Sequence, residues 1–271
     1  MDIIDIGVNL EHDSFDSDRE QVMERAADAG VRRMIVTGSS HASSVRASKL
    51  ASEHPGRLYS TAGIHPHHAV DYTHDDREWI VNLVENEWVV AIGECGLDFF
   101  RNFSDPKDQE AAFIAQLVIA RETGLPVFLH QRDAHERFSA ILRDHIGSLQ
   151  GGVAHCFTGG QAELEAYLDL GLYIGITGWV CDERRGVELA SALKYIPHDR
   201  LLIETDAPYL LPRDLVPRPK KRRNEPMYLA HVLSVIARHV DCESDALAAQ
   251  TTANATRLFG LLETGTGDIS D

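Results

Sequence analysis

Apolar and polar positions follow one another in a regular order along this chain. Short runs rich in β-branched residues predict buried strands over 3–8, 33–37, 58–63, 89–93, 127–130, 153–155, 173–176 and 201–204. Longer amphipathic stretches predict helices over 18–29, 43–53, 76–86, 106–123, 134–145, 162–170, 184–195 and 227–239, with a further packing helix over 245–259. Because strand and helix alternate throughout, we expect an α/β fold of repeated βα units, a (β/α)₈ TIM barrel.

The length and composition favour one domain. A single barrel needs about 250 residues, and the chain has 271. We expect one domain over 1–262 and a mobile tail over 263–271, where ETGTGDISD has little to bury. No run approaches the roughly 20 apolar residues of a membrane span, and the four cysteines form no CxxC pair. We therefore expect a cytoplasmic protein with no membrane contact. A monomer is expected, although no feature of the sequence shows the oligomeric state.

Several predicted strands end at residues that can bind a metal ion. Glu94, His130, His155 and Asp206 lie at or just beyond such ends, and His65 follows STAGI in the same way. The carboxyl ends of barrel strands meet at one rim, and burial of such groups is unfavourable unless they are paired or coordinate a cation. We predict a divalent metal site formed by Glu94, His130 and His155, with Asp206 as a ligand or general base. His65 is expected to join the ligands, to contact the reacting group or to be structural.

Two cysteines directly follow predicted ligands. Neighbouring residues in a strand point to opposite faces, so if Glu94 and His155 face the barrel mouth, Cys95 and Cys156 face the helices. We expect both thiols to be small buried packing groups rather than ligands.

The net charge of −16 argues against broad wrapping of nucleic acid, so any contact with a polyanion must be local. Residues 213–223 form a basic strip that contains one acid. This strip follows the eighth predicted strand, a common place for phosphate binding in barrels. Arg222 and Arg223 are the preferred phosphate contacts, and Arg184 and Arg185 in the preceding loop are further candidates; a solvated charged loop is the alternative.

Trp179 and Phe157 lie near the predicted rim. Either ring could stack on unpaired bases, a mode of binding that tolerates any sequence, or could be part of the packing.

The segments GIHPH, IGECGLDF, FLHQRDA, HCFTG, ITGWVCDERRG, LLIETDAPYLLPRD and RRNEP occur in this order along nearly the whole chain. In these segments the chain resembles the TatD family of metal-dependent deoxyribonucleases, in particular its bacterial branch. The resemblance implies a TIM barrel of the amidohydrolase-like metallohydrolase type. It further implies a cytoplasmic, magnesium-dependent 3′-5′ exonuclease that acts on single-stranded DNA and also on RNA, with a role in DNA repair.

The resemblance also assigns roles to residues. Glu94, His130 and His155 match the family's metal ligands, and Asp206 matches its catalytic or ligating aspartate. The first strand departs from the D-x-H-x-H pattern of the wider family, because Gly7 and Asn9 stand where the histidines would be. A permanent two-metal centre is therefore not expected.

The identity of the metal and of the scissile bond stays open at this point. Two imidazoles with a carboxylate suit Mn²⁺ or Zn²⁺, whereas the resemblance implies Mg²⁺, which we place first. Besides a phosphodiesterase, the residues allow a deacylase of mischarged tRNA or another amide or ester hydrolase. The loss of histidines at Gly7 and Asn9 also allows a binding protein without catalysis.

Overall fold

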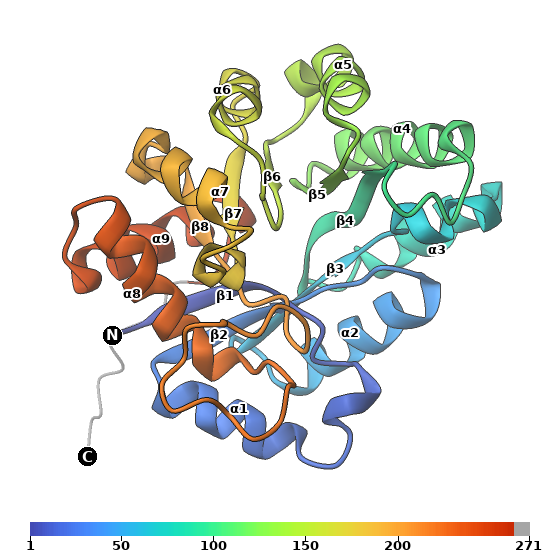
Figure 1. Cartoon of the computed structure of the whole chain (residues 1–271). Helices are drawn as coiled ribbons and strands as arrows, with labels where there is room; N and C mark the ends of the chain where they lie inside the picture. The colour runs from blue at the N-terminus through green and yellow to red at the C-terminus, as the bar shows by residue number, and fades with distance from the viewer. Residues whose placement is uncertain (263–271) are drawn as a thin grey trace.

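The computed structural model describes residues 1–262, and there it is a barrel of eight parallel strands in the order β1 to β8 (Figure 1). Each strand pairs with the next along the chain. The strands are β1 (Ile3–Val8), β2 (Val31–Val36), β3 (Leu58–Ala62), β4 (Val89–Asp98), β5 (Val127–Arg132), β6 (Gly152–Ala154), β7 (Tyr173–Ile176) and β8 (Leu201–Ile203). The predicted TIM barrel is confirmed.

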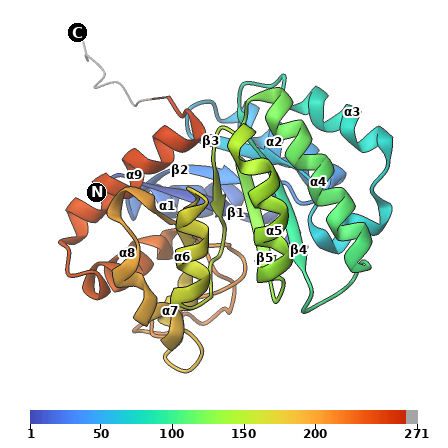
Figure 2. The ribbon, with the colours of Figure 1, turned by 90° about the horizontal axis from the view of Figure 1, so that it is seen from above.

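Helices lie outside the strands, as Figure 2 shows from above. They are α1 (Arg19–Asp28), α2 (His41–Glu53), α3 (His74–Leu83), α4 (Pro106–Thr123), α5 (His135–His145), α6 (Gln161–Asp169), α7 (Val187–Ala192), α8 (Leu229–His239) and α9 (Ser244–Phe259). Pro106 in the first turn and Gly124, with φ 70°, bound α4, which spans the predicted range 106–123. None of the helices in residues 1–262 has the length and apolar character needed to cross a membrane.

Hydrogen bonds between β1 and the segment after β8 close the barrel. The backbone N–H of Asp206 donates to the carbonyl of Gly7 at 2.8 Å, and the N–H of Asn9 donates to the carbonyl of Ala207 at 2.8 Å. The two ends of the domain therefore meet beside the residues predicted to react.

The barrel interior is packed rather than hollow. All eight strands contribute to one apolar cluster, to which α9 adds Ala255, Phe259 and nearby Leu261. Because α9 contacts β1 and β8, it covers one end of the barrel, and the polar residues described below gather at the other. A second cluster lies between the strands and the surrounding helices.

Most predicted boundaries agree with the structure to within about two residues, but three elements differ by more. The helix predicted over 76–86 ends at Leu83 as α3. The strand predicted over 89–93 continues to Asp98 as β4, so Glu94 lies within the strand rather than after it. The helix predicted over 184–195 begins only at Val187, because Arg184 and Arg185 belong to a turn in which their N–H groups donate to the carboxylate of Asp182. The predicted tail over 263–271 lies outside the described residues.

Candidate metal centre

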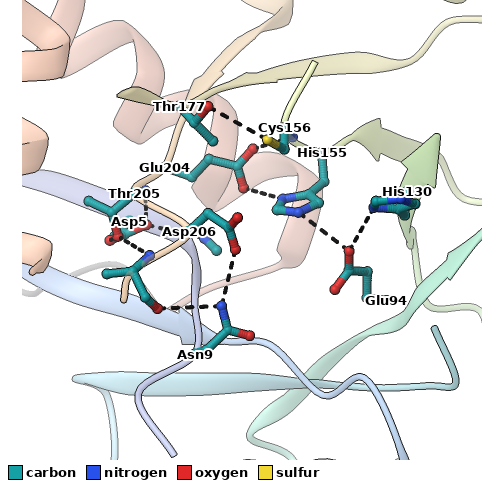
Figure 3. Close-up of polar contacts among 12 residues, drawn as sticks. Asp5, Asn9, Glu94, His130, His155, Cys156, Thr177, Glu204, Thr205 and Asp206 are labelled. Atoms are coloured by element: carbon teal, nitrogen blue, oxygen red, sulfur yellow. Dashed lines mark hydrogen bonds and ion pairs between the residues drawn. The ribbon is translucent and has the colours of Figure 1, made fainter. Parts of the chain in front are cut away.

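One carboxylate oxygen of Glu94 lies among three imidazoles. Its Oε1 is 3.1 Å from Nδ1 of His130, 3.5 Å from Nε2 of His155 and 3.4 Å from Nε2 of His65. Figure 3 shows His130 and His155 on either side of this oxygen. The structure thus brings together the three predicted ligands and His65.

Glycines allow the backbone to approach closely where Glu94 projects. Gly93 has φ 136° and Gly96 has φ 145°, values that favour glycine. A Cβ at either position would collide with a backbone carbonyl of β5, that of Phe128 or of His130. The segment IGECG therefore holds β4 tightly against β5, with Glu94 and His130 on neighbouring strands.

A second carboxylate orients His155. Nδ1 of His155 lies 2.6 Å from Oε2 of Glu204, and the N–H of Cys156 donates to Oε1 of Glu204 at 2.6 Å (Figure 3). Although burial opposes protonation of His155, the charges of Glu204 and Glu94 raise the pKa of His155 to about 10. With its Nδ1–H donated to Glu204, the ring directs Nε2 towards Glu94, the arrangement usual for a metal-binding histidine.

Glu204 is a site residue that was not predicted from the sequence. It is fully buried directly after β8, and a Cβ at Gly7 or at Gly175 would collide with its carboxylate. Glu204 therefore fills the space beside β1 that a histidine at Gly7 would need. A signal was present in LLIETD, because Glu204 directly follows the apolar run, the position at which ligands were expected on other strands.

His130 is also supported by a carboxylate. Its Nε2 is buried, has no hydrogen-bond partner within residues 1–262 and lies 3.5 Å from Oδ2 of Asp98. The same Oδ2 is 2.8 Å from Nε2 of His67. Although burial raises the pKa of Asp98, the nearby ring of His130 and the hydrogen bonds with the N–H of Arg101 and with His67 hold that pKa well below its usual range.

His65 differs from the other two histidines because one of its nitrogens already accepts a hydrogen bond. The N–H of His67 donates to Nδ1 of His65 at 3.1 Å. Burial lowers the pKa of His65 well below its usual value, so the ring is neutral and its single proton lies on Nε2, which faces Glu94. His65 is thus arranged as a donor at Nε2, whereas Nε2 of His155 would present a lone pair to a cation once it has lost its proton.

Asp206 lies beside His155, and one of its carboxylate oxygens is within 4.8 Å of a ring nitrogen of His155. Its Oδ1 accepts from Nδ2 of Asn9 at 3.0 Å (Figure 3). Burial, together with the charges of Glu94 and Glu204, raises the pKa of Asp206 to about 7. Asn9 stands where the wider family pattern has a histidine. Its neutral amide donates to Asp206 and so orients that carboxyl group.

These residues fit a divalent cation. His65, Glu94 and His130 form one group of donor atoms within 4.8 Å of one another, and His155, Cys156 and Asp206 form a second. Buried carboxylates with nearby imidazoles, and an unpartnered Nε2 on His130, are the donors that a cation would satisfy.

The predicted packing of the two cysteines is right for one of them. Cys95 is buried in the cluster beneath the helices. For Cys156 the predicted orientation towards the helices is wrong, because its Sγ lies within 4.8 Å of donor atoms of His155 and Asp206; that the thiol is not a ligand stays a prediction. β6 ends at Ala154 and Cys156 has φ 47°, so the alternation of a strand no longer applies there.

Of the four predicted phosphate contacts, Arg222 is the one whose guanidinium has no hydrogen bond or ion pair with residues 1–262. Arg223 is held by both oxygens of Asp18 at 2.7 Å and by Glu225 at 2.8 Å, and it packs over Phe15. Its predicted role as a free phosphate contact is therefore wrong, and it fixes the loop after β8 to α1 instead, which Figure 1 shows in orange and blue.

Arg184 and Arg185 lie beside Asp182 rather than unpaired. Nε of Arg185 donates to Oδ2 of Asp182 at 2.8 Å, and its guanidinium lies 4.4 Å from the centre of the Trp179 ring. Nε of Arg184 is 4.0 Å from Oδ1 of the same carboxylate. The stacking alternative for Phe157 is wrong, because that ring is buried against Tyr167.

The model of the family "TatD related DNase" matches residues 4–260 of this chain. The chain belongs to the TatD-related DNase family. It is 54% identical over 259 residues to the "3'-5' ssDNA/RNA exonuclease TatD" of Erwinia billingiae, a match that covers 96% of this chain and 99% of that protein. The family assignment given by the sequence motifs is confirmed.

Solved structures of TatD proteins have the same fold. The TatD homolog YJJV of Escherichia coli is 29% identical with a TM-score of 0.87, covering 96% of this chain and 98% of that one. A hydrolase TatD family protein of Entamoeba histolytica is 25% identical with a TM-score of 0.88, covering 97% and 99%. Within this family of nucleases, the alternative of a binding protein without catalysis loses its support.

Proposed function

We propose that this chain is a metal-dependent 3′-5′ exonuclease that hydrolyses single-stranded DNA and RNA. The observation that carries the proposal is the Glu94 oxygen within 3.5 Å of three imidazole nitrogens, two of whose rings have a further carboxylate beside them. The polarity and the substrates follow from the printed name of the relatives that are about 54% identical over the whole domain.

Glu94, His130 and His155 would hold the cation. When bound, it supplies Lewis acidity to a phosphoryl oxygen and lowers the pKa of water from 15.7 towards about 7. We place Mg²⁺ first because the resemblance to the family implies it. Mn²⁺ and Zn²⁺ are the other candidates, because imidazole ligands suit these two ions better than Mg²⁺.

Asp206 accepts the proton of the attacking water in this proposal. Asn9 donates to its Oδ1, which leaves the second oxygen for that proton. A carboxyl with a pKa near 7 in the free protein holds and releases a proton at neutral pH. The water oxygen bonds to phosphorus as its proton passes to Asp206. The bond between phosphorus and O3′ of the shortened strand breaks, and O3′ takes up the proton that Asp206 had accepted, which releases the terminal nucleotide with a 5′-phosphate.

His65 binds the reacting phosphate rather than the cation. Its neutral ring carries the proton on Nε2, and a donor at that atom can hydrogen-bond a non-bridging phosphoryl oxygen as negative charge develops. Arg222 contributes attraction for the strand at the outer rim. We place the protein in the cytoplasm as a monomer with a role in DNA repair.

A time course with oligonucleotides tests the proposal. Single-stranded DNA and RNA labelled at the 5′ end are incubated with metal-stripped protein plus Mg²⁺, Mn²⁺ or Zn²⁺. We expect a ladder that shortens from the 3′ end, release of mononucleotides and no reaction in chelator, with Glu94→Gln as the inactive control. An intact strand with every metal, together with release of amino acid from mischarged tRNA, would instead establish the deacylase alternative.

A further inference from the structure

Two phenylalanines project from the loop between β4 and α4. Phe103 is 65% exposed and Phe100 is 54% exposed. Seven of the nine phenylalanines of the chain are buried or half-buried, so these two depart from the rule for this residue type.

The loop holds both rings on a fixed backbone. The N–H groups of Phe100 and Arg101 donate to Oδ1 of Asp98 at 3.0 and 2.8 Å. On the other side of Phe103, Ser104 is buried, and its Oγ accepts from the N–H of Val70 at 3.0 Å. The loop is therefore anchored on both sides of the exposed rings, so a ligand would meet them already in position.

A row of rings connects Phe103 with the candidate metal centre. The Phe103 ring lies 4.7 Å from the His67 ring, edge to face, and the His67 ring lies 4.2 Å from the His65 ring. His65 in turn is 3.4 Å from Oε1 of Glu94. Asp98 joins the two regions, because it anchors the loop through Oδ1 and contacts His67 and His130 through Oδ2.

Guanidinium groups accompany the exposed rings. The centre of the Arg132 guanidinium lies 3.9 Å from the centroid of the Phe100 ring, and that of Arg101 lies 5.7 Å from it. Alternating aromatic and cationic groups match the bases and phosphates of an unpaired strand, because bases stack on rings and guanidinium groups bind phosphate. A base within a duplex is already stacked and paired, so its face is not available to such a ring.

We propose that Phe103 and Phe100 form a stacking platform for unpaired bases, with Phe103 contacting the base next to the scissile phosphate and Arg132 contacting the strand beside Phe100. The inference rests on the proposed nuclease function and adds to it the group that selects single strands. Phe103 is a substrate-binding residue here and takes no part in the proton transfers.

Removal of a ring and removal of a base test this contact together. Wild-type protein, Phe103→Ala and Phe103→Tyr are compared on a single-stranded oligonucleotide and on the same strand with an abasic tetrahydrofuran residue in each of its three 3′-terminal positions in turn. We expect Phe103→Ala to reduce kcat/KM about 5- to 150-fold on the normal strand, the range that corresponds to one stacked base. Phe103→Tyr should retain the wild-type value.

The abasic strands separate stacking from an effect through His67. At one position the wild type should lose activity by the factor that Phe103→Ala shows, and Phe103→Ala should lose little more on that strand. Equal losses for wild type and variant on every abasic strand, or an unchanged kcat/KM for Phe103→Ala, would overturn the proposal. Metal titration by calorimetry should give the same affinity for wild type and Phe103→Ala, since no ligand has changed.

Tyr195 offers a matched control for loss of an exposed ring, because it is 43% exposed on the outer helices. We expect Tyr195→Ala to leave kcat/KM unchanged on all strands. If the wild-type protein leaves the normal strand intact with every metal, the nuclease function itself is contradicted. If the wild type is active but its activity does not depend on Phe103, only the stacking platform is contradicted.

Discussion

Oε2 of Glu204 lies 2.6 Å from Nδ1 of His155, and neither residue is exposed to more than a small extent. The carboxylate occupies the space that a side chain at Gly7 would enter. A histidine at Gly7 and a glutamate at Glu204 therefore exclude each other in this barrel. The absence of a histidine at Gly7 therefore leaves room for the carboxylate of Glu204, which orients the predicted ligand His155.

Loss of the charge at Glu204 should weaken metal binding. In Glu204→Gln a single carbonyl oxygen must serve both His155 and the N–H of Cys156, so the ring of His155 is held less well. We expect metal affinity, measured by calorimetric titration of stripped protein, to fall about 10- to 100-fold. Glu183→Gln, a change at an exposed position, serves as the control, and equal affinities for both variants would exclude this role for Glu204.

A methyl group at Gly7 should destabilise the protein because Glu204 is in the way. We expect Gly7→Ala to lower the free energy of unfolding by about 1–3 kcal/mol in urea titrations, as overpacking of a buried site does. The same substitution in a Glu204→Ala background should lower it by less, because the obstructing carboxylate is absent. Equal losses in both backgrounds would mean that the two positions do not compete for space.

Glu94 and Asp206 should differ in what they contribute. Glu94→Gln removes the charged oxygen shared by three imidazoles, so we expect both metal binding and nuclease activity to be lost. Asp206→Asn should keep metal affinity within a few-fold and reduce kcat by about 10²–10⁴, the usual contribution of a general base. If Asp206→Asn abolishes metal binding in calorimetry, Asp206 is a ligand rather than the base.

Two adjacent arginines should give opposite results. Arg222 is exposed, and we expect Arg222→Glu to raise KM for oligonucleotides and to reduce the dependence of KM on salt, with an unchanged melting temperature. Arg223 is bound to Asp18 and Glu225, so Arg223→Gln should lower the free energy of unfolding by about 1–3 kcal/mol. Kinetics at several salt concentrations and thermal melts measure both, and a stability loss confined to Arg222→Glu would reverse the assignment.

The contribution of Arg223 to stability should depend on pH through Asp18. Hydrogen bonding to Arg223 lowers the pKa of Asp18 from 3.8 to about 2. A carboxyl whose pKa is lower in the folded state stabilises the protein above the unfolded value and loses this contribution as pH falls from about 4 towards 2.

The difference in unfolding free energy between wild type and Arg223→Gln should therefore be constant from pH 7 to pH 5 and smaller at pH 3. Urea titrations at these pH values give the comparison. A difference of the same size at pH 3 would show that the Asp18 charge is not involved.

Local patterns in the sequence were sufficient for the barrel and for the ligands at its rim. A buried strand needs a short apolar run and an amphipathic helix needs an apolar stripe. The positions of both can therefore be predicted from residues that are close together in the sequence. Glu94, His130 and His155 could be found because each lies at or just beyond the end of such a run, and parallel strands bring those ends together.

Pairings between distant residues came only from the folded chain. Nothing near Arg223 in the sequence shows that Asp18 holds it, and nothing near Glu204 shows that Gly7 and Gly175 leave it room. Phe103 became a candidate and Phe157 was excluded on the same grounds, since exposure depends on which distant segments cover a ring. The residue types at a site follow from local order, whereas their partners depend on contacts between segments that are far apart in the chain.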